Sequence, residues 1–448
     1  MKYTKGYYFV RNLVILILVY LLCIKCDTTR EGLTDTVSPV LHIREDISYL
    51  TLNEEYDISY FVESIYDRSN LTEAYFILNQ RKDAISFNTV GEHSFLIQAQ
   101  DRYGNISNKY VSVIVNDVPS LVNVRDRLVL QGEEFDALRN VLAVDRMDGT
   151  ISDKIKVNTE DLDCSRMGTY EITYSITDSC GATSTKNARV LVCNETLYER
   201  QAEHKQYGLT KEELEILHEC NYFRYEALHE PDYDKALELT LPALLNLESD
   251  KAICSGVIAY ISPEYIYCLS VEHGMTDMRD GAYITFFNGE SIYARLPYIR
   301  LACDNEISLF RIPVSLIPTE DLLQLRQISI NDNPFYYMSM EEGEPLVLHC
   351  ANLEPGEITA KETEAIFAYD SFVWQDEELD KDYQFYCTCL SAYSVSRKGE
   401  SGTAVIDYYG NLAGIVSVTG TVDDVRKDYY LKIDKLDEFE ARIEQLDR

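Results

Sequence analysis

The sequence predicts a mostly β protein of 448 residues, long enough for about three domains. Two β-sandwich modules are expected first, then a short helical connector, a β-barrel domain and a C-terminal helix. Three observations predict this class. Two segments repeat with the turn and strand pattern of paired strands, residues 196–250 carry helical periodicity, and residues 251–432 alternate between short apolar strands and turns.

Residues 1–26 predict a targeting segment. Lys2, Lys5 and Arg11 precede the apolar run LVILILVYLLCI at residues 13–24, which has the length of a signal-peptide core. No small-x-small cleavage site follows, so an uncleaved signal anchor is favoured over a cleaved signal peptide. The basic flank favours an N-inside orientation. Both interpretations place the rest of the chain outside the cytoplasm, either anchored in the cell membrane or secreted.

Charge and cysteine content narrow the function classes. The chain has 41 Lys+Arg against 75 Asp+Glu, a net charge of −34, which disfavours nucleic acid as a partner. An even number of cysteines in an exported chain predicts disulfides of undetermined connectivity. No paired C-x-x-C is present, so we expect no metal site and no cofactor. The cysteines beyond the targeting segment are Cys164, Cys180, Cys193, Cys220, Cys254, Cys268, Cys303, Cys350, Cys387 and Cys389.

The repeat defines two modules, at residues 38–116 and 117–195. VGEHSFLIQAQDRYGNISNKYVSVIV and MGTYEITYSITDSCGATSTKNARVLV align without gaps, so that Gly91 matches Gly168 at a spacing of 77 residues (168 − 91). Both copies read as strand, Asp-x-x-Gly turn, strand. The alternation in YEITYSIT is the period of a half-buried strand. Each module therefore has the pattern and size of a β-sandwich.

The second module carries VDRMDGTISDKIKV followed by GTYEITYSITDSCG, and this pattern resembles the immunoglobulin-like modules of bacterial surface proteins. The resemblance covers most of residues 117–194 and implies a spacer or adhesive role, with a surface protein as the partner. Asp145, Asp148 and Asp178 suggest calcium, but turn-capping aspartates are the preferred interpretation.

Helices are predicted on both sides of the last domain. In the connector, residues 196–250, Thr210 and Glu213 form a capping box before an apolar-periodic run. At the C-terminus, the segment IDKLDEFEARIEQL places four apolar residues on one helical face. These residues are Ile433, Leu436, Ile443 and Leu446.

Candidate catalytic residues lie in the last domain, residues 251–448. Ser401 lies in GESGTAVID, a weak motif by itself because turns are rich in Gly and Ser. A nucleophilic serine needs a histidine base and an orienting acid. His273, which follows a predicted strand, leaves 128 residues before Ser401 (401 − 273), whereas His349 leaves too little chain. In CDNEISLFRIP, Asp304 and Glu306 precede an apolar strand, so either is a candidate acid.

Residues 251–448 resemble the trypsin-like serine peptidases of the chymotrypsin fold. The resemblance rests on SGVIAYISPEYIYCLSVEHG, NEISLFRI and GESGTAVIDYYGNLAGIVSVTG. It implies a two-barrel fold and cleavage of a protein or peptide substrate. It assigns Ser401 as the nucleophile, His273 as the general base, and the backbone N–H groups of Gly399 and Ser401 as the oxyanion hole. Ser417 matches the serine that supports the acid.

The chain departs from this family at three places. Glu306 stands where the family has Asp, and Asp304 remains the alternative acid. Glu400 replaces the usual Asp before the nucleophile, and no activation site precedes the domain, so maturation by a freed N-terminus is not expected. Thr419 and Val395 line the predicted specificity pocket, where they disfavour cleavage after Lys or Arg.

Three hypotheses follow from these residues. The first is an active serine endopeptidase on the cell surface. The second is an inactive or weak peptidase fold used for binding, because the acid position is altered. The third is a structural or adhesive surface protein whose Ig-like modules dominate its function. A fluorophosphonate probe that labels Ser401 separates the first hypothesis from the other two.

Overall fold

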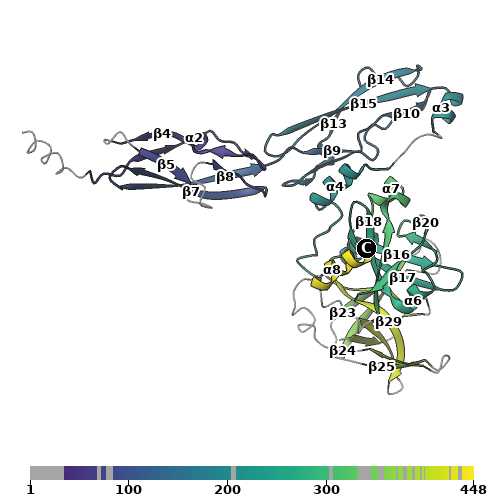
Figure 1. Cartoon of the computed structure of the whole chain (residues 1–448). Coiled ribbons are helices and arrows are strands. Elements are labelled where there is room, and N and C mark those ends of the chain that lie inside the picture. Colours follow the sequence, from purple (N-terminus) through teal and green to yellow (C-terminus); the bar gives the residue numbers. More distant parts are fainter. Residues whose placement is uncertain are drawn as a thin grey trace, which may run out of the picture. The chain divides into compact units, whose positions relative to one another are not determined.

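The structure is a computed structural model of the whole chain (Figure 1). The described residues are 35–67, 72–76, 84–202, 208–301, 306–330, 345–351, 358–369, 372–376, 381–385, 389–393, 396–397, 399–422, 425–431 and 436–447. They form two compact units, the first ending at Val118 and including Asp178–Ala182, and the second containing the remainder. The targeting segment lies outside the described residues. Within those residues, no helix is both long and apolar enough to cross a membrane.

The first module is a sandwich of small sheets, antiparallel except for the parallel pair β2–β8, in purple to blue in Figure 1. Its core contains Phe61, Phe95, Ile97 and Val113, all buried. The four-stranded sheet has the order β2 (Leu50–Thr51), β8 (Ile106–Asn116), β7 (Gly91–Asp101) and β5 (Thr72–Phe76). The other elements are β1 (Val40–Ile43) paired with β4 (Val62–Tyr66), β3 (Tyr56–Asp57) paired with β6 (Ala84–Ile85), and the short helix α2 (Ile58–Phe61).

The second module places a four-stranded and a three-stranded sheet around a core that includes Ala143, Ile172 and Tyr174. The first sheet has the order β10 (Arg127–Leu130), β15 (Thr183–Cys193), β14 (Gly168–Thr177) and β13 (Lys156–Asn158). The second has the order β12 (Gly149–Thr150), β11 (Leu142–Asp145) and β9 (Ser120–Val122), and η2 (Ser152–Lys154) follows β12. The predicted β-sandwich pattern is therefore confirmed in both modules.

The two long hairpins have the same register. Gly91 of β7 pairs with Val115 of β8, and Gly168 of β14 pairs with Val192 of β15, so the sequence repeat is also a repeat of strand pairing. Asp101 accepts hydrogen bonds from turn amides of its own hairpin. Asp178 likewise accepts from the Ala182 N–H at 2.8 Å, and Asp145 accepts from the Met147 and Asp148 N–H groups, so two of the three aspartates considered for calcium act in turns.

Where the structure describes it, the connector contains three α-helices, one 3-10 turn and the strand β16 (Leu244–Glu248). The helices are α3 (Glu195–Ala202), α4 (Lys211–Glu219) and α5 (Tyr233–Thr240), and α5 continues into η3 (Leu241–Ala243). The predicted capping box is present: the Glu213 N–H donates to Thr210 Oγ1 at 3.1 Å, and the Thr210 N–H donates to Glu213 Oε2 at 3.0 Å.

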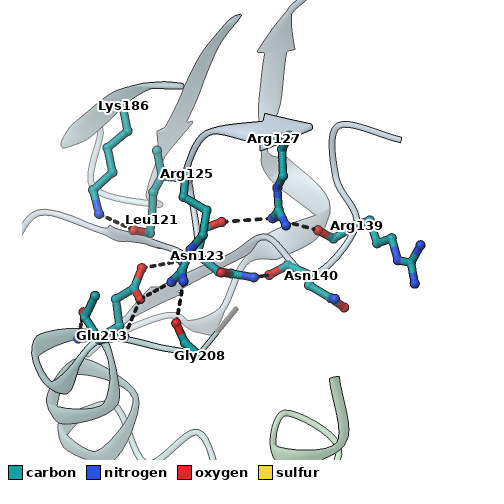
Figure 2. A network of polar contacts seen from close by, with 10 residues as sticks. Leu121, Asn123, Arg125, Arg127, Arg139, Asn140, Lys186, Gly208 and Glu213 are labelled. Carbon is teal, nitrogen blue, oxygen red and sulfur yellow. Dashed lines mark hydrogen bonds and ion pairs between the residues drawn. The ribbon is translucent and has the colours of Figure 1, made fainter. Parts of the chain in front are cut away.

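Glu213 also joins α4 to the second module (Figure 2). Its Oε1 accepts from the Asn123 N–H at 2.7 Å, and its Oε2 lies 2.7 Å from Nη2 of Arg125. Beside these polar contacts, Val122 and Val144 of the module share one buried cluster with Leu214 and Leu217 of α4. The second module is therefore packed onto the connector.

The first half of the last domain is a seven-stranded antiparallel sheet. Its order is β20 (Ser291–Ala294), β19 (Ala282–Phe286), β16 (Leu244–Glu248), β17 (Ile253–Ile261), β18 (Tyr265–Val271), β22 (Ile307–Pro313) and β21 (Tyr298–Arg300). Strand β16 comes from the expected connector but lies between β17 and β19. This sheet therefore begins before the boundary expected at residue 251. The short helices here are α6 (Glu272–Thr276), η4 (Val314–Leu316) and α7 (Thr319–Leu322).

The second half is a closed six-stranded barrel. Its order is β23 (Pro345–Ala351), β24 (Ile358–Tyr369), β27 (Cys389–Tyr393), β30 (Val425–Leu431), β29 (Leu412–Val422) and β28 (Ala404–Asp407). Strands β25 (Phe372–Asp376) and β26 (Lys381–Phe385) form a separate two-stranded hairpin. The mostly β architecture with a barrel is thus confirmed.

The C-terminal helix α8 (Leu436–Asp447) packs against the seven-stranded sheet. Ile443 and Leu446 join the core, as their helical spacing predicted, while Ile433 lies outside the described residues. Asp447 accepts from the Tyr267 hydroxyl at 2.7 Å and forms an ion pair with Arg311. These contacts fix the end of the chain on strands β18 and β22.

The disulfide prediction is wrong for the six cysteines whose side chains the structure describes. None of the six is in a disulfide, and for two of them the strand register shows why: Cys254 faces Leu247, and Cys268 faces Ile258 and Phe310. A disulfide needs Cα atoms roughly 5.5 Å apart with converging Cβ vectors. The six are Cys164, Cys180, Cys193, Cys220, Cys254 and Cys268.

Candidate active site

His273 and Glu306 meet at one end of the seven-stranded sheet. His273 lies in α6, which directly follows β18, and Glu306 directly precedes the neighbouring strand β22. Nδ1 of His273 and Oε1 of Glu306 are 2.6 Å apart. The Glu272 N–H donates to the Glu306 carbonyl oxygen at 2.7 Å, which fixes the two backbones beside each other. The carboxylate is nearly buried, whereas the imidazole is 41% exposed and open to a ligand.

The same carboxylate links the sheet to the barrel. Ser417 of β29 donates from Oγ to Oε2 of Glu306 at 2.6 Å, so both oxygens of Glu306 are occupied. Ser401, in the loop before β28, donates from Oγ to the carbonyl oxygen of Ser417 at 3.3 Å. The four residues therefore form one continuous chain of hydrogen bonds. Among the hydrogen bonds of the described residues, none joins the Ser401 hydroxyl directly to His273.

Two glycines shape the loop that carries Ser401. Gly399 has φ +95° and Gly402 has φ +88°, both in the left-handed region that favours glycine. The Ser255 N–H of β17 donates to the Ser401 carbonyl oxygen at 2.8 Å. A Cβ on Gly402 would lie 2.1 Å from the Ser255 carbonyl oxygen and 2.5 Å from Ser270 Oγ. The second glycine of the Gly-x-Ser-Gly motif is therefore required by close contact with the sheet.

Glu400, between Gly399 and Ser401, is buried in an ion pair. Its Oε1 lies 2.8 Å from Nζ of Lys361 in β24. Its Oε2 accepts from the Arg397 N–H at 2.7 Å. The side chain of Glu400 thus turns away from the imidazole and into the barrel side of the loop.

A second ion pair borders the histidine. Glu272 binds Arg300 of β21, and this hydrogen bond raises the pKa of the guanidinium above its usual value. Arg300 is largely exposed, so the pair contributes little to stability. It places a cation and an anion next to the open face of His273.

The structure brings together most, but not all, of the predicted site residues. Hydrogen bonds connect four of them: His273, Glu306, Ser401 and Ser417. Gly399 lies two residues before Ser401 in the same loop. Asp304 and Val395 lie outside the described residues. Thr419 is in β29 and His349 is in β23, but nothing is described of either side chain.

Lys361 and the Ser255–Gly402 contact were not predicted from the sequence. The sequence did contain a signal for such a lysine. Glu400 lies next to the candidate nucleophile, and since no freed N-terminus is expected to pair with it, it needs another cation. The sequence offers several lysines and arginines for that role, and only the barrel topology selects one. No pattern marked Ser255, because it contributes only backbone groups, an N–H to Ser401 and a carbonyl oxygen beside Gly402.

Away from this site, the described residues contain one cluster of three acidic side chains. In the first module, oxygen atoms of Asp35, Asp67 and Asp101 lie within 4.8 Å of one another. Asp101 accepts from the backbone N–H groups of Tyr103 and Asn105 and from the Asn105 side chain, so its charge is already used in the turn. The expectation of no metal site stays a prediction.

The comparison with protein families matches the second module. The family described as "Bacterial surface protein, Ig-like domain" matches residues 120–192, which confirms the resemblance seen in the sequence. Pesticidal crystal protein Cry22Aa of Bacillus thuringiensis is 28% identical over 117 residues, 24% of this chain and 16% of that protein. An uncharacterized 81.3 kDa protein of Acholeplasma phage L2 is 22% identical over 155 residues, 33% of this chain and 21% of that protein. The chain thus spans about a fifth of these relatives or less.

Serine proteases are among the solved structures to which the chain is similar. The Rv3671c protease from M. tuberculosis in its active form is 15% identical, with a TM-score of 0.35, over 49% of this chain and 89% of that one. The HtrA-type protease AlgW with tripeptide is 17% identical, with a TM-score of 0.36, over 48% of this chain and 64% of that one. Inactive forms are among the similar structures as well.

Proposed function

We propose that the chain is a serine endopeptidase in which Ser401 is the nucleophile, His273 the general base and Glu306 the acid that orients the base. The observation that carries this proposal is the double use of the Glu306 carboxylate. One oxygen binds Nδ1 of His273 and the other accepts from Ser417, so the imidazole is fixed with Nε2 free for proton transfer.

The mechanism follows from these positions. When a peptide binds, the Ser401 hydroxyl turns from the Ser417 carbonyl oxygen to Nε2 of His273, a tightening that is common when substrate enters a serine peptidase. Oγ attacks the scissile carbonyl while Nε2 takes its proton. The N–H groups of Gly399 and Ser401 stabilise the negative oxygen of the tetrahedral intermediate. His273 then protonates the leaving amine, and water hydrolyses the acyl-enzyme by the same route in reverse.

The site of action that we propose is the outer face of the cell membrane. The basic residues before the apolar run at 13–24 support an anchor, with secretion as the alternative. The match of residues 120–192 to a bacterial surface Ig-like domain supports exposure at the surface. The substrate is a protein or peptide, and the Ig-like modules bind a surface protein or hold the catalytic part away from the membrane.

A fluorophosphonate probe tests the proposed activity. It should label the full-length protein, and labelling should vanish in Ser401→Ala and His273→Ala while the melting temperature stays within a few degrees of the parent. The turnover of a peptide library should fall about 10⁴-fold in each variant. A parent protein that takes up no probe would overturn the proposal.

One observation favours the second candidate, a peptidase fold used for binding. In the structure the Ser401 hydroxyl donates to the Ser417 carbonyl oxygen and not to His273. If that geometry persists with a bound peptide, the serine has no base. The same probe decides this point, because an inert Ser401 with measurable peptide binding is the outcome that the binding function requires.

A further inference from the structure

The loop that carries Ser401 is fixed through the side chain of Glu400. Glu400 as a residue is 7% exposed, and its carboxylate accepts from Nζ of Lys361 at 2.8 Å and 3.1 Å. It also accepts from the Arg397 N–H at 2.7 Å, and the Glu400 N–H donates back to the Arg397 carbonyl oxygen at 3.1 Å. Thr403 N–H donates to the Glu400 carbonyl oxygen at 3.1 Å. Glu400 thus closes the turns on both sides of Gly399 and Ser401.

A buried carboxylate of this kind depends on its cation. Removal of one partner of a buried ion pair leaves an uncompensated charge, which is strongly unfavourable. Lys361 lies in β24 and pairs with Leu348 of β23, so its position is set by the barrel itself. Without Lys361, the Glu400 side chain would turn toward water and the 399–403 backbone would move with it.

Strand β16, directly ahead of β17, does not offer a competing cation. In a peptidase that matures by cleavage, a new α-amino group has to reach the acid beside the nucleophile. Here the chain ahead of β17 is β16, a central strand in which Leu245 pairs with Gly256 on one side and Phe286 on the other. The ammonium group at Glu400 is instead that of a barrel lysine.

We infer that Lys361 is a positioning residue that holds the 399–402 loop in its oxyanion-binding form, so that the protein is active without cleavage of the chain. This inference rests on the proposed function for its consequence in catalysis. The effect of Lys361 on the loop does not depend on the proposed function, because it is a property of the folded chain.

The test compares full-length wild type with Lys361→Met, Lys361→Arg and Lys211→Met. Lys211 is the matched control because it also pairs with a glutamate, Glu264, but in an exposed ion pair. Lys361→Met should lower kcat for a peptide on the order of a hundredfold, the effect of a lost oxyanion donor, with little change in KM. Lys361→Arg should recover most of the loss because it restores the cation, and Lys211→Met should match wild type.

Hydrogen exchange of residues 399–403, measured by mass spectrometry, gives a readout that needs no activity. Exchange should rise in Lys361→Met and not in Lys211→Met. The intact mass of the probe-labelled wild type should be that of an uncleaved peptidase domain. The double variant Lys361→Met with Glu400→Met controls for folding, because an apolar pair removes the buried charge. It should melt like wild type and still turn over slowly, since the contact with Arg397 is gone.

The outcomes separate the two proposals. Full activity and unchanged exchange in Lys361→Met would overturn the inference, as would labelling confined to a chain cut ahead of the peptidase domain. A wild type that takes up no probe, combined with raised exchange in Lys361→Met, would support the role of Lys361 in the loop and overturn the peptidase function.

Discussion

Glu306 accepts a hydrogen bond from His273 at 2.6 Å, although the two residues are 33 positions apart in the chain. The contact is possible because β18 and β22 are antiparallel neighbours whose ends coincide, with Val271 paired to Ile307. The glutamate side chain, which is one methylene longer than aspartate, therefore reaches the imidazole from the position directly before the strand.

Glu306→Gln should nearly abolish the proposed peptidase activity. The amide cannot serve both neighbours as the carboxylate does, so His273 is left in the wrong tautomer, which costs on the order of 10⁴ in turnover. The measurement is kcat on a peptide substrate. Asp304→Asn is the control, and we expect it to be nearly silent. The reverse pattern would move the orienting acid to Asp304.

Ser417→Ala should lower kcat by about 10-fold to 100-fold, because a hydrogen bond to a buried carboxylate contributes about 1.5–3 kcal/mol. Ser308→Ala is the matched control, since Ser308 is equally buried but its Oγ has no hydrogen-bond partner among the described residues. Steady-state kinetics on both variants distinguish the two serines. Equal effects would mean that Ser417 serves packing and not the acid.

Gly402→Ala should unfold the Ser401 loop and remove probe labelling. Its Cβ would lie 2.1 Å from the Ser255 carbonyl oxygen, which cannot move without breaking the sheet. Gly410→Ala has nearly the same φ, +87°, but its nearest neighbour is 3.7 Å away, so it should cost only the strain of the left-handed backbone, about 1–2 kcal/mol. Urea denaturation of both variants measures the difference. A Gly402→Ala protein that labels normally would show that the loop can relax away from Ser255 and that the site does not need this contact.

Glu213→Ala should destabilise the packing of the second module on the connector. It removes the acceptor for the buried Asn123 N–H and one half of the capping box, a loss of about 1–3 kcal/mol. Thermal unfolding followed by circular dichroism should show a lower midpoint. Glu215→Ala, on the exposed face of α4, should leave the midpoint unchanged. Equal midpoints for both variants would argue against the network in Figure 2 as a stabilising contact.

The Cys254 thiol should resist alkylation in the folded protein. Burial raises its pKa to about 12, so the thiol stays protonated at pH 8 and is also out of reach of a reagent. Iodoacetamide followed by peptide mapping should modify Cys254 only after denaturation, while the partly exposed Cys164 reacts earlier. Rapid modification of Cys254 under native conditions would show that this part of the sheet opens.

Much of the architecture could be predicted because its signals are local. The spacing from Gly91 to Gly168 located the repeated hairpins, and the Thr210–Glu213 pair marked the start of α4. The order of His273, an acid and Ser401 located the candidate site. Each of these depends on turn chemistry, capping or periodicity within a short stretch of chain.

The remaining features depend on contacts between distant segments. The partner of Glu400 is decided by which strand of the barrel passes beside it, and the absence of a cysteine opposite Cys254 is decided by the register of β16 and β17. A charge count or an even number of cysteines contains neither kind of information. The disulfide prediction therefore failed for the described cysteines, while the helix and hairpin predictions held.

The place of β16 in the sheet decides how the molecule can be divided. A fragment that started at residue 251 would lack the strand between β17 and β19 and would present two unpaired edges, which promote aggregation. Since α4 and α5 pack on the same core, a soluble catalytic fragment has to start ahead of Thr210. A protease that trims the chain would release a folded last domain only by cutting upstream of that residue.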